Sequence, residues 1–186
     1  MPPQARPIDM GLPSGIQWAS CNVGAEKPAD IGLYFSWGNI VGHREGEEYN
    51  FTQSVYNSTP AAGIDTDLSL DQDAARANMG EPWRMPTDTE FQELVDNCTS
   101  QWTTVNGVSG VLFTSNLNGE TLFFPAAGRY DGKSLLYAGT YGYYWSTVYN
   151  SETRALLMNF SSQSVSPHSG SNRYFGVSVR AVMPSL

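Results

Sequence analysis

Histidine and cysteine are scarce in this sequence, and their scarcity limits the chemistry that the chain can perform. The 186 residues contain two histidines, His43 and His168, and two cysteines, Cys21 and Cys98. Neither pair has the spacing of a zinc, redox or three-histidine site. The GxSxG, P-loop and GxGxxG patterns of hydrolases and nucleotide-binding proteins are also missing. These absences predict no catalytic residues, no metal site and no cofactor.

Basic residues and long hydrophobic runs are also few. Ten Lys and Arg residues stand against 18 Asp and Glu, which gives a net charge of -8 at pH 7. A surface of this sign repels phosphate backbones and anionic headgroups, so we expect no nucleic acid partner. No apolar run approaches the roughly 18 residues of a membrane span. The start, MPPQARPIDM, lacks the apolar core and basic flank of a signal peptide.

The two cysteines leave two alternatives open. A disulfide between Cys21 and Cys98 would close a long loop and contribute about 4 kcal/mol in the chain-entropy model. Two buried free thiols in the core fit the sequence equally well. Both alternatives are retained at this point.

An acidic cluster precedes one of the expected helices. Counted from Asp67 as an EF-hand loop, it has Gln72 where glycine is required and Asn78 where the bidentate glutamate should stand. We therefore interpret these carboxylates as stabilising the positive N-terminus of the following helix rather than binding calcium. The cluster consists of Asp65, Asp67, Asp71 and Asp73.

The composition favours short strands and many turns over long helices. Hydrophobic residues make up 40% and aromatic residues 12% of the chain, with 18 glycines and 11 prolines. We expect an N-terminal tail over residues 1–7 and a single α+β domain over residues 8–186, with a surface insertion at 39–67. One helix should follow Thr87, where Glu90 completes a capping box, and a shorter helix should run from Ser69 to Gly80.

The strands are predicted from alternation and from turn residues. Residues 111–114 and 121–125 should form a hairpin around Asn118-Gly119. In the last strand Val177, Val179 and Ala181 alternate with Ser178 and Arg180, which predicts a half-buried strand. The remaining expected strands are 16–20, 33–37, 143–146 and 155–160.

Six motifs follow one another in a recognisable order. They are GLPSGIQWASCNVGA, YFSWG, DQDAARANMGEPWRMPTDTEFQELVDNC, FFPAAGRY, GYYWST and NRYFGVSVRAV. Together they resemble the Fibrobacter succinogenes major paralogous domain family of bacterial proteins, over about Ile8 to Val182. The resemblance implies a C-type-lectin-like fold, related to the formylglycine-generating enzyme group, with two helices and a twisted, mostly antiparallel sheet.

The resemblance also raises an enzyme hypothesis that these residues argue against. Formylglycine-generating enzymes bind copper through cysteines near the C-terminal end, and here no cysteine follows Cys98. Sulfoxide synthases of the same fold use a histidine cluster, and true C-type lectins bind sugars through calcium motifs that are missing here. We therefore expect non-catalytic ligand binding, with a formylglycine-generating-like enzyme as the least favoured alternative.

The C-terminal part resembles the variable region of diversity-generating retroelement proteins, in which adenine-directed recoding changes exposed positions. The resemblance implies a fixed framework at Tyr144-Trp145-Ser146, Ala155, Phe160, Val165, Pro167, Arg173, Gly176 and Ser178-Val179-Arg180. Leu156, Leu157 and Gln163 depart from this recoding pattern. Thirteen residues between the framework positions are reachable from asparagine codons by changing adenines alone: Tyr149, Asn150, Ser151, Asn159, Ser161, Ser164, Ser166, Ser169, Gly170, Ser171, Asn172, Tyr174 and Phe175. Tyr, Ser, Gly and Asn also dominate antibody paratopes, because tyrosine gives contact area at low entropy cost.

We therefore predict a binding face for a protein or glycan at a cell or phage surface, with Tyr149, Tyr174 and Phe175 as anchors. Location at the cell surface, outside the cell or on a phage particle follows from this hypothesis. A fixed structural or adhesive cell-surface module of a Bacteroidetes-type bacterium is the alternative, in which the loops are polar simply because loops are. The predicted binding residues are Tyr149, Asn150, Ser151, Arg154, Asn159, Ser161, Ser164, Ser166, His168, Ser169, Ser171, Asn172, Tyr174 and Phe175.

Overall fold

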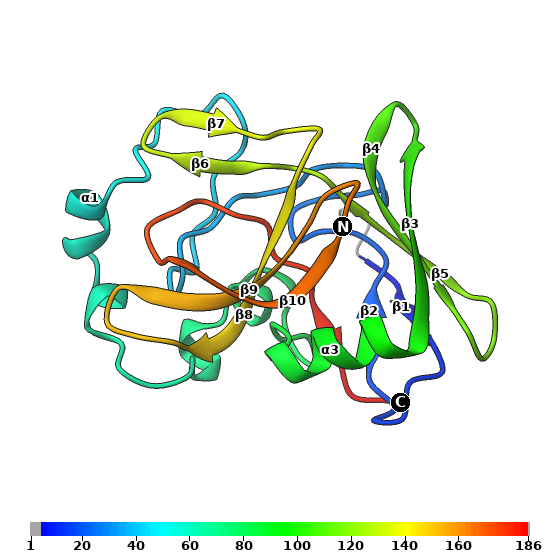
Figure 1. Ribbon diagram of the computed structural model, residues 1–186. Helices are drawn as coiled ribbons and strands as arrows, with labels where there is room; N and C mark the ends of the chain where they lie inside the picture. Colours follow the sequence, from blue (N-terminus) through cyan, green and yellow to red (C-terminus); the bar gives the residue numbers. More distant parts are fainter. Residues whose placement is uncertain (1–4, 186) are drawn as a thin grey trace.

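The computed structural model describes residues 5–185, and within them it has an α+β architecture (Figure 1). The first four residues of the expected tail, and Leu186 at the end of the expected domain, lie outside the described residues. Pro7, also assigned to that tail, already belongs to strand β1 (Pro7–Ile8) and pairs with Ala19 of β2 (Gln17–Ala19). Strand β11 (Val182–Met183) pairs with the other side of β2, so the two ends of the described chain meet in one sheet.

The strands form four small antiparallel sheets in the described part of the chain, where one twisted sheet was expected. Strand β3, the β6–β7 hairpin and β10 were not predicted. The sheets are β1-β2-β11 (Pro7–Ile8, Gln17–Ala19, Val182–Met183), β3-β4-β5 (Cys98–Val105, Val108–Ser115, Thr121–Pro125), β6-β7 (Arg129–Asp131, Ser134–Leu136) and β10-β9-β8 (Val165–Asn172, Arg154–Phe160, Gly142–Tyr149).

Helix α3 (Asp88–Asn97) confirms the predicted capping box, with Thr87 and Glu90 each accepting from the other's backbone N–H. The expected helix from Ser69 to Gly80 is instead divided into η2 (Leu70–Gln72) and α2 (Ala74–Met79). Asp73 leaves the helical conformation between them, and its carboxylate caps α2 by accepting from the Arg76 N–H. This contact confirms the helix-stabilising interpretation for Asp73.

Segment 39–67, expected as a surface insertion, contributes to the core. It contains a third helix, α1 (Gln53–Asn57), and η1 (Pro60–Gly63), neither of which was predicted. Phe51 and Tyr56 are buried, and the Tyr56 hydroxyl donates to the Trp37 carbonyl at 2.6 Å. The expected strand at 33–37 is reduced to two isolated bridges, to His43 and to Val177.

The prediction of a half-buried strand near the C-terminus is wrong, because both of its faces are buried. Ser178 and Arg180 are 0% exposed. The segment lies between two hydrophobic clusters, a first one that contains Trp37 and Tyr56 and a second one that contains Trp18 and Phe91. The Arg180 guanidinium donates to Asn22 Oδ1 and to the carbonyls of Ala19 and Phe123, at 2.7 to 3.2 Å. Burial lowers the pKa of Arg180, and these three acceptors replace the water that the cation loses.

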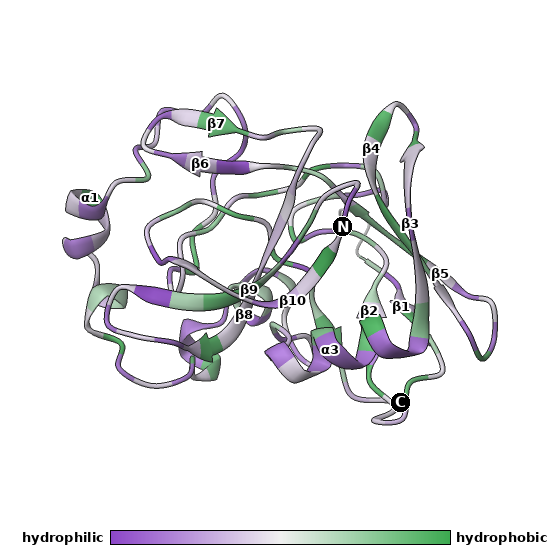
Figure 2. Ribbon diagram, viewed as in Figure 1, coloured by the Kyte–Doolittle hydropathy of each residue, from purple (hydrophilic) through white to green (hydrophobic). Residues whose placement is uncertain are grey.

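The β10-β9-β8 sheet separates the two clusters. Trp145 and Leu157 face the first cluster, whereas Tyr144 and Met158 face the second, which α3 covers. Figure 2 shows α3 alternating between hydrophilic and hydrophobic residues, as expected of a helix that buries one side. The free-thiol alternative holds for both cysteines, and burial raises the pKa of Cys98 to about 11.

Candidate functional site

The predicted binding residues are divided between the two ends and the two faces of the β10-β9-β8 sheet. Strand pairing places Gly142, Phe160 and Val165 side by side at one end, and Tyr149 beside Ala155 at the other. The strands are up to eight residues long, and at about 3.3 Å per residue the two ends lie about 20 Å apart. Ser161 and Ser164 are at the first end; Tyr149, Asn150, Ser151, Asn172 and Tyr174 are at the second.

Arg173 organises the second end. It is 1% exposed and donates to the carbonyls of Ile64, at 2.8 Å, and Ser151. Its guanidinium also lies over the rings of Trp37 and Tyr149, 4.7 and 5.1 Å from their centroids. Tyr149 is therefore held against the core by a cation–π contact. An open hollow of about 640 Å³ lies nearby, between α1, η1 and Thr153.

Four predicted residues are occupied by contacts within the fold. Ser171 and Phe175 are each 7% exposed, so the structure does not present Phe175 as a surface anchor. His168 faces α3, with Nδ1 2.9 Å from Asp88 Oδ2 and Nε2 2.8 Å from Gln92 Oε1. The Arg154 guanidinium donates to the Gly170 carbonyl on the neighbouring strand.

Three predicted residues lie together on the face of the sheet that points away from α3. Asn159 is paired with Tyr143 on β8 and with Ser166 on β10, so these three side chains form one row across the sheet. The Asn159 side-chain amide donates to Ser169 Oγ at 3.1 Å. Asn159, Ser166 and Ser169 are all half-buried, which leaves part of each side chain open to solvent.

An aromatic cluster continues this row beyond β8. Tyr143 stacks on Tyr141 with centroids 6.0 Å apart, and Tyr141 contacts Tyr137 at 5.3 Å. Tyr137 and Tyr141 are 47% and 40% exposed. Arg129 of β6 lies 5.3 Å from the centroids of Tyr137 and Tyr143, and 4.3 Å from that of Phe175. We call this set the tyrosine–arginine platform: Arg129, Tyr137, Tyr141, Tyr143 and Phe175 together with Asn159, Ser166 and Ser169.

The charge of Arg129 is not neutralised within the described residues. No carboxylate of residues 5–185 forms a salt bridge with it, and no acceptor among them forms a hydrogen bond with its guanidinium. The Nε atom is buried without a partner. The two Nη atoms also form no hydrogen bond within residues 5–185, but they are not fully buried and so reach solvent. Burial raises the pKa of Tyr143 against the opposing effect of Arg129, so its hydroxyl stays protonated at neutral pH.

Four residues of the platform were not predicted from the sequence: Arg129, Tyr137, Tyr141 and Tyr143. The available signal was three tyrosines within seven residues, in YAGTYGY, next to glycines that favour turns. Arg129 stands eight positions before the first of them. The β6–β7 hairpin, which brings it back beneath Tyr137, was not predicted.

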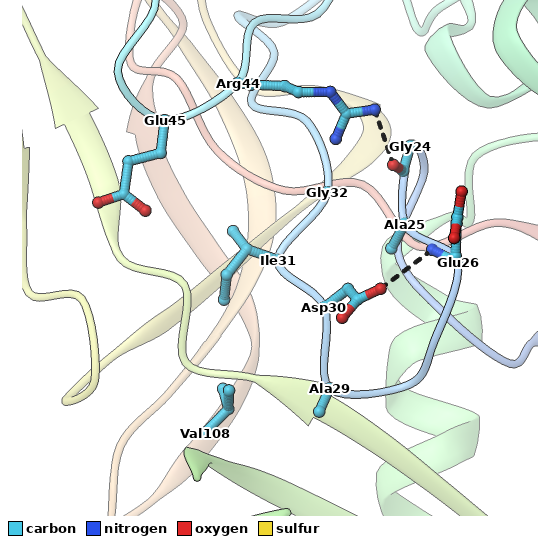
Figure 3. A pocket seen from close by; sticks show the side chains of 10 residues that line it. All are labelled: Gly24, Ala25, Glu26, Ala29, Asp30, Ile31, Gly32, Arg44, Glu45 and Val108. Atoms are coloured by element: carbon cyan, nitrogen blue, oxygen red, sulfur yellow. Dashed lines mark hydrogen bonds between the residues drawn. The ribbon is translucent and has the colours of Figure 1, made fainter. Parts of the chain in front are cut away.

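A second hollow, of about 520 Å³, opens beside the loop from Gly24 to Gly32 (Figure 3). Its polar groups hold the loop in place. Arg44 reaches across to donate to the Gly24 carbonyl at 3.0 Å. The Asp30 carboxylate accepts from the backbone N–H groups of Glu26 and Lys27. The carboxylates of Glu26 and Glu45 also line the hollow, and neither forms a salt bridge within residues 5–185.

Residues 99–182 match a family model described as a domain of unknown function (DUF8237). The match covers less than half of the chain, and it contains every residue of the platform. No curated protein and no solved structure matches the chain. None of the helices within residues 5–185 is long and apolar enough to cross a membrane. No group of three or more His, Cys, Asp or Glu residues in that range is arranged to hold a metal ion.

Proposed function

We propose that this protein is a non-catalytic ligand-binding domain that displays its contact surface on a C-type-lectin-like scaffold. The α+β class and the antiparallel sheets agree with such a scaffold, and the six-motif resemblance supports it. The ligand is a protein or glycan at a cell or phage surface. The contact surface is the face of the β10-β9-β8 sheet that points away from α3, which we call the open face, together with its adjoining loops.

One observation carries the proposal: burial follows the division into framework and variable positions that the retroelement resemblance implies. A protein with a recoded surface needs its framework positions buried and its variable positions accessible, because buried residues must stay constant to preserve packing. The buried framework positions are Tyr144, Trp145, Ser146, Ala155, Phe160, Arg173, Gly176, Ser178, Val179 and Arg180, with Val165 and Pro167 half-buried.

The positions between them are mostly accessible. Asn150 and Ser164 are exposed. Of the expected variable residues, only Ser171 and Phe175 are not accessible. Both are buried, so neither can contact a ligand directly, and Phe175 belongs to the platform only as the ring on which the Arg129 guanidinium rests. The half-buried members are Tyr149, Ser151, Asn159, Ser161, Ser166, Ser169, Gly170, Asn172 and Tyr174.

The experiment that tests the proposal is deep sequencing of codons 144 to 182 across the population of cells or phages that carries the gene. We expect substitutions at the accessible positions and unchanged codons for Trp145, Phe160, Arg173 and Gly176. An invariant stretch would reject the diversified protein and leave a surface of fixed specificity.

A fixed adhesive module is the second candidate, and one observation favours it. Ile40 and Val41 are adjacent, 41% and 68% exposed, and lie in segment 39–67 rather than on the platform. Exposed apolar neighbours of this kind suit a contact inside a larger assembly. Replacing both by serine should abolish assembly if this module is the true role, and should leave ligand binding unchanged if the first proposal holds.

A further inference from the structure

We propose that the tyrosine–arginine platform is a subsite for a saccharide that carries a carboxylate. The inference rests on the proposed binding function and names the class of ligand. Arg129, Tyr137, Tyr141 and Tyr143 all precede codon 144, so they lie outside the proposed variable stretch. These four residues would thus give a constant anchor beside the variable positions Asn159, Ser166 and Ser169.

The uncompensated cation defines the charge of the ligand. The chain as a whole carries a net charge of -8, yet Arg129 has no acidic partner among residues 5–185. Its Nη atoms reach solvent while the rest of the guanidinium lies against the rings of Tyr143 and Phe175. A guanidinium fixed in this way can bind a carboxylate through two parallel hydrogen bonds.

The exposed rings define the body of the ligand. The C–H bonds on one side of a pyranose ring are weakly positive, and they stack on the negative face of an aromatic ring. Tyr137 and Tyr141 provide such faces next to Arg129, and Tyr141 is stacked nearly parallel to Tyr143, with 19° between the rings. A sugar ring on Tyr141 would therefore place a carboxyl substituent within reach of the cation.

The remaining groups favour a saccharide over a peptide segment. Asn159 and Ser166 add an amide and a hydroxyl group in the same row as Tyr143, and Ser169, which accepts from the Asn159 amide, adds a second hydroxyl beside them; such groups suit sugar hydroxyls. The platform contains no aliphatic side chain of the kind that packs against the apolar anchors of a peptide. Phe175, its most apolar member, is buried beneath Arg129.

The turn that carries the exposed tyrosines is held rigidly. Tyr137 has a φ of 63°, a left-handed conformation that an aromatic residue rarely adopts. Its carbonyl accepts hydrogen bonds from the N–H groups of Thr140 and Tyr141 and from the Thr140 hydroxyl, at 3.0 Å each. The Gly128 N–H also donates to the Tyr141 carbonyl at 2.8 Å. A surface fixed in advance loses less entropy on binding.

The test is calorimetric titration of the full chain with sialyllactose, a trimer of galacturonic acid and a hyaluronan tetrasaccharide. Lactose and galactotriose are the neutral counterparts, and a sulfated galactose trimer is the anionic one. We expect at least one carboxylated probe to bind at least tenfold more tightly than its neutral and sulfated counterparts. The change Arg129→Gln should weaken that binding tenfold or more.

Lys133→Gln is the matched control, because it removes one positive charge from the exposed β6–β7 turn outside the platform. It should change the affinity less than twofold. Tyr141→Ala, at a 40% exposed position, should weaken binding about fivefold or more while leaving the circular dichroism spectrum unchanged. It keeps the test decisive if Arg129→Gln disturbs folding.

Two results would overturn the inference. One is failure of every carboxylated probe to bind; the other is equal binding of the neutral or sulfated probes with no effect of Arg129→Gln. The proposed binding function would survive either result if codon sequencing still showed diversification of the accessible positions. It would fail separately if those codons were invariant and no ligand of the open face were found.

Discussion

The two faces of the β10-β9-β8 sheet use similar side chains for different purposes. On the face covered by α3, Tyr144, Met158 and Phe160 are at most 1% exposed. The open face is equally well packed around Trp145 and Leu157, but toward its other end it carries Tyr143 and Asn159 and then the exposed Tyr141. The second face is therefore core at one end and surface at the other.

Arg180 and Arg129 show the same contrast between core and surface. Arg180 is buried and donates to three acceptors, whereas Arg129 has its Nη atoms open to solvent and no acceptor within residues 5–185. Both guanidinium groups lie 4.3 Å from a phenylalanine centroid, Phe124 and Phe175 respectively. The difference in hydrogen bonding, and not the aromatic contact, separates an arginine that stabilises the fold from one that is available to a ligand.

The largest expected effect lies on the α3 side. Phe91 is 0% exposed and packs 5.4 Å from Trp18, so Phe91→Ala should lower the free energy of unfolding by about 3–5 kcal/mol. Tyr141→Ala should lower it by less than about 1 kcal/mol. Urea denaturation of both variants measures the contrast. Similar losses for the two would show that the platform is part of the core.

The arginine pair gives the next largest effect. Arg180→Met should cost about 3 kcal/mol of stability, because it leaves the Ala19 and Phe123 carbonyls and the Asn22 amide oxygen buried without a donor. Arg129→Met has no such acceptor to leave behind and should cost less than about 1 kcal/mol. Thermal unfolding followed by circular dichroism distinguishes the two. A large loss for Arg129→Met would contradict the assignment of Arg129 to ligand binding.

Glu90, at the start of α3, gives a pH-dependent effect. Burial alone would raise its pKa, but the hydrogen bonds from Arg84, at 2.7 Å, and from Thr87 outweigh burial and lower it. The stabilisation is therefore present above the unfolded pKa of about 4.3 and is lost as pH falls through the lower folded value. Glu90→Gln should cost about 1–2 kcal/mol at pH 7 and almost nothing in strong acid.

The comparison must be made between variant and parent at each pH. Burial raises the pKa of Asp73, so its own contribution falls as pH rises, opposite to that of Glu90. Glu120→Gln at an exposed position is the control and should show the same small difference at every pH. A cost of Glu90→Gln that persisted below pH 2 would contradict the ion-pair explanation.

The smallest expected effect is at the contact between β10 and α3. His168→Ala removes the hydrogen bonds to Asp88 and Gln92 from a side chain that is 41% exposed, and should cost about 1 kcal/mol. It should not alter ligand affinity, since His168 lies on the α3 side of the sheet. If His168→Ala weakened binding as much as Tyr141→Ala does, the ligand would contact the α3 side of the sheet, and the proposed contact surface would be wrong.

Local signals in the sequence predicted the α+β class, the capped helix and the β4–β5 hairpin. These features depend on neighbouring residues, as with Thr87 and Glu90 or the turn at Asn118-Gly119. The polar strand β10 was unpredictable in this way, because VSPHSGSN has no alternation and is strand only through its pairing with β9. Long-range packing, not local pattern, likewise buries Ser178 and Arg180.

The candidate site was predicted only in part, for the same reason. The paratope-like composition pointed to Asn159, Ser166 and Ser169, which the structure brings together. It also pointed to Phe175 and His168, whose environments are set by Arg129 and by α3 across the fold. Arg129 itself is recognisable as a site residue only once three separate segments are seen to meet around it.

The central claim is that the open face of the β10-β9-β8 sheet contacts the ligand. Nuclear magnetic resonance of the labelled chain, titrated with the galacturonic acid trimer, tests it most directly. The account predicts shifts in the Arg129 guanidinium, in the rings of Tyr137 and Tyr141 and in the Asn159 amide, with His168 and α3 unchanged. Shifts confined to α3 and His168 would contradict it.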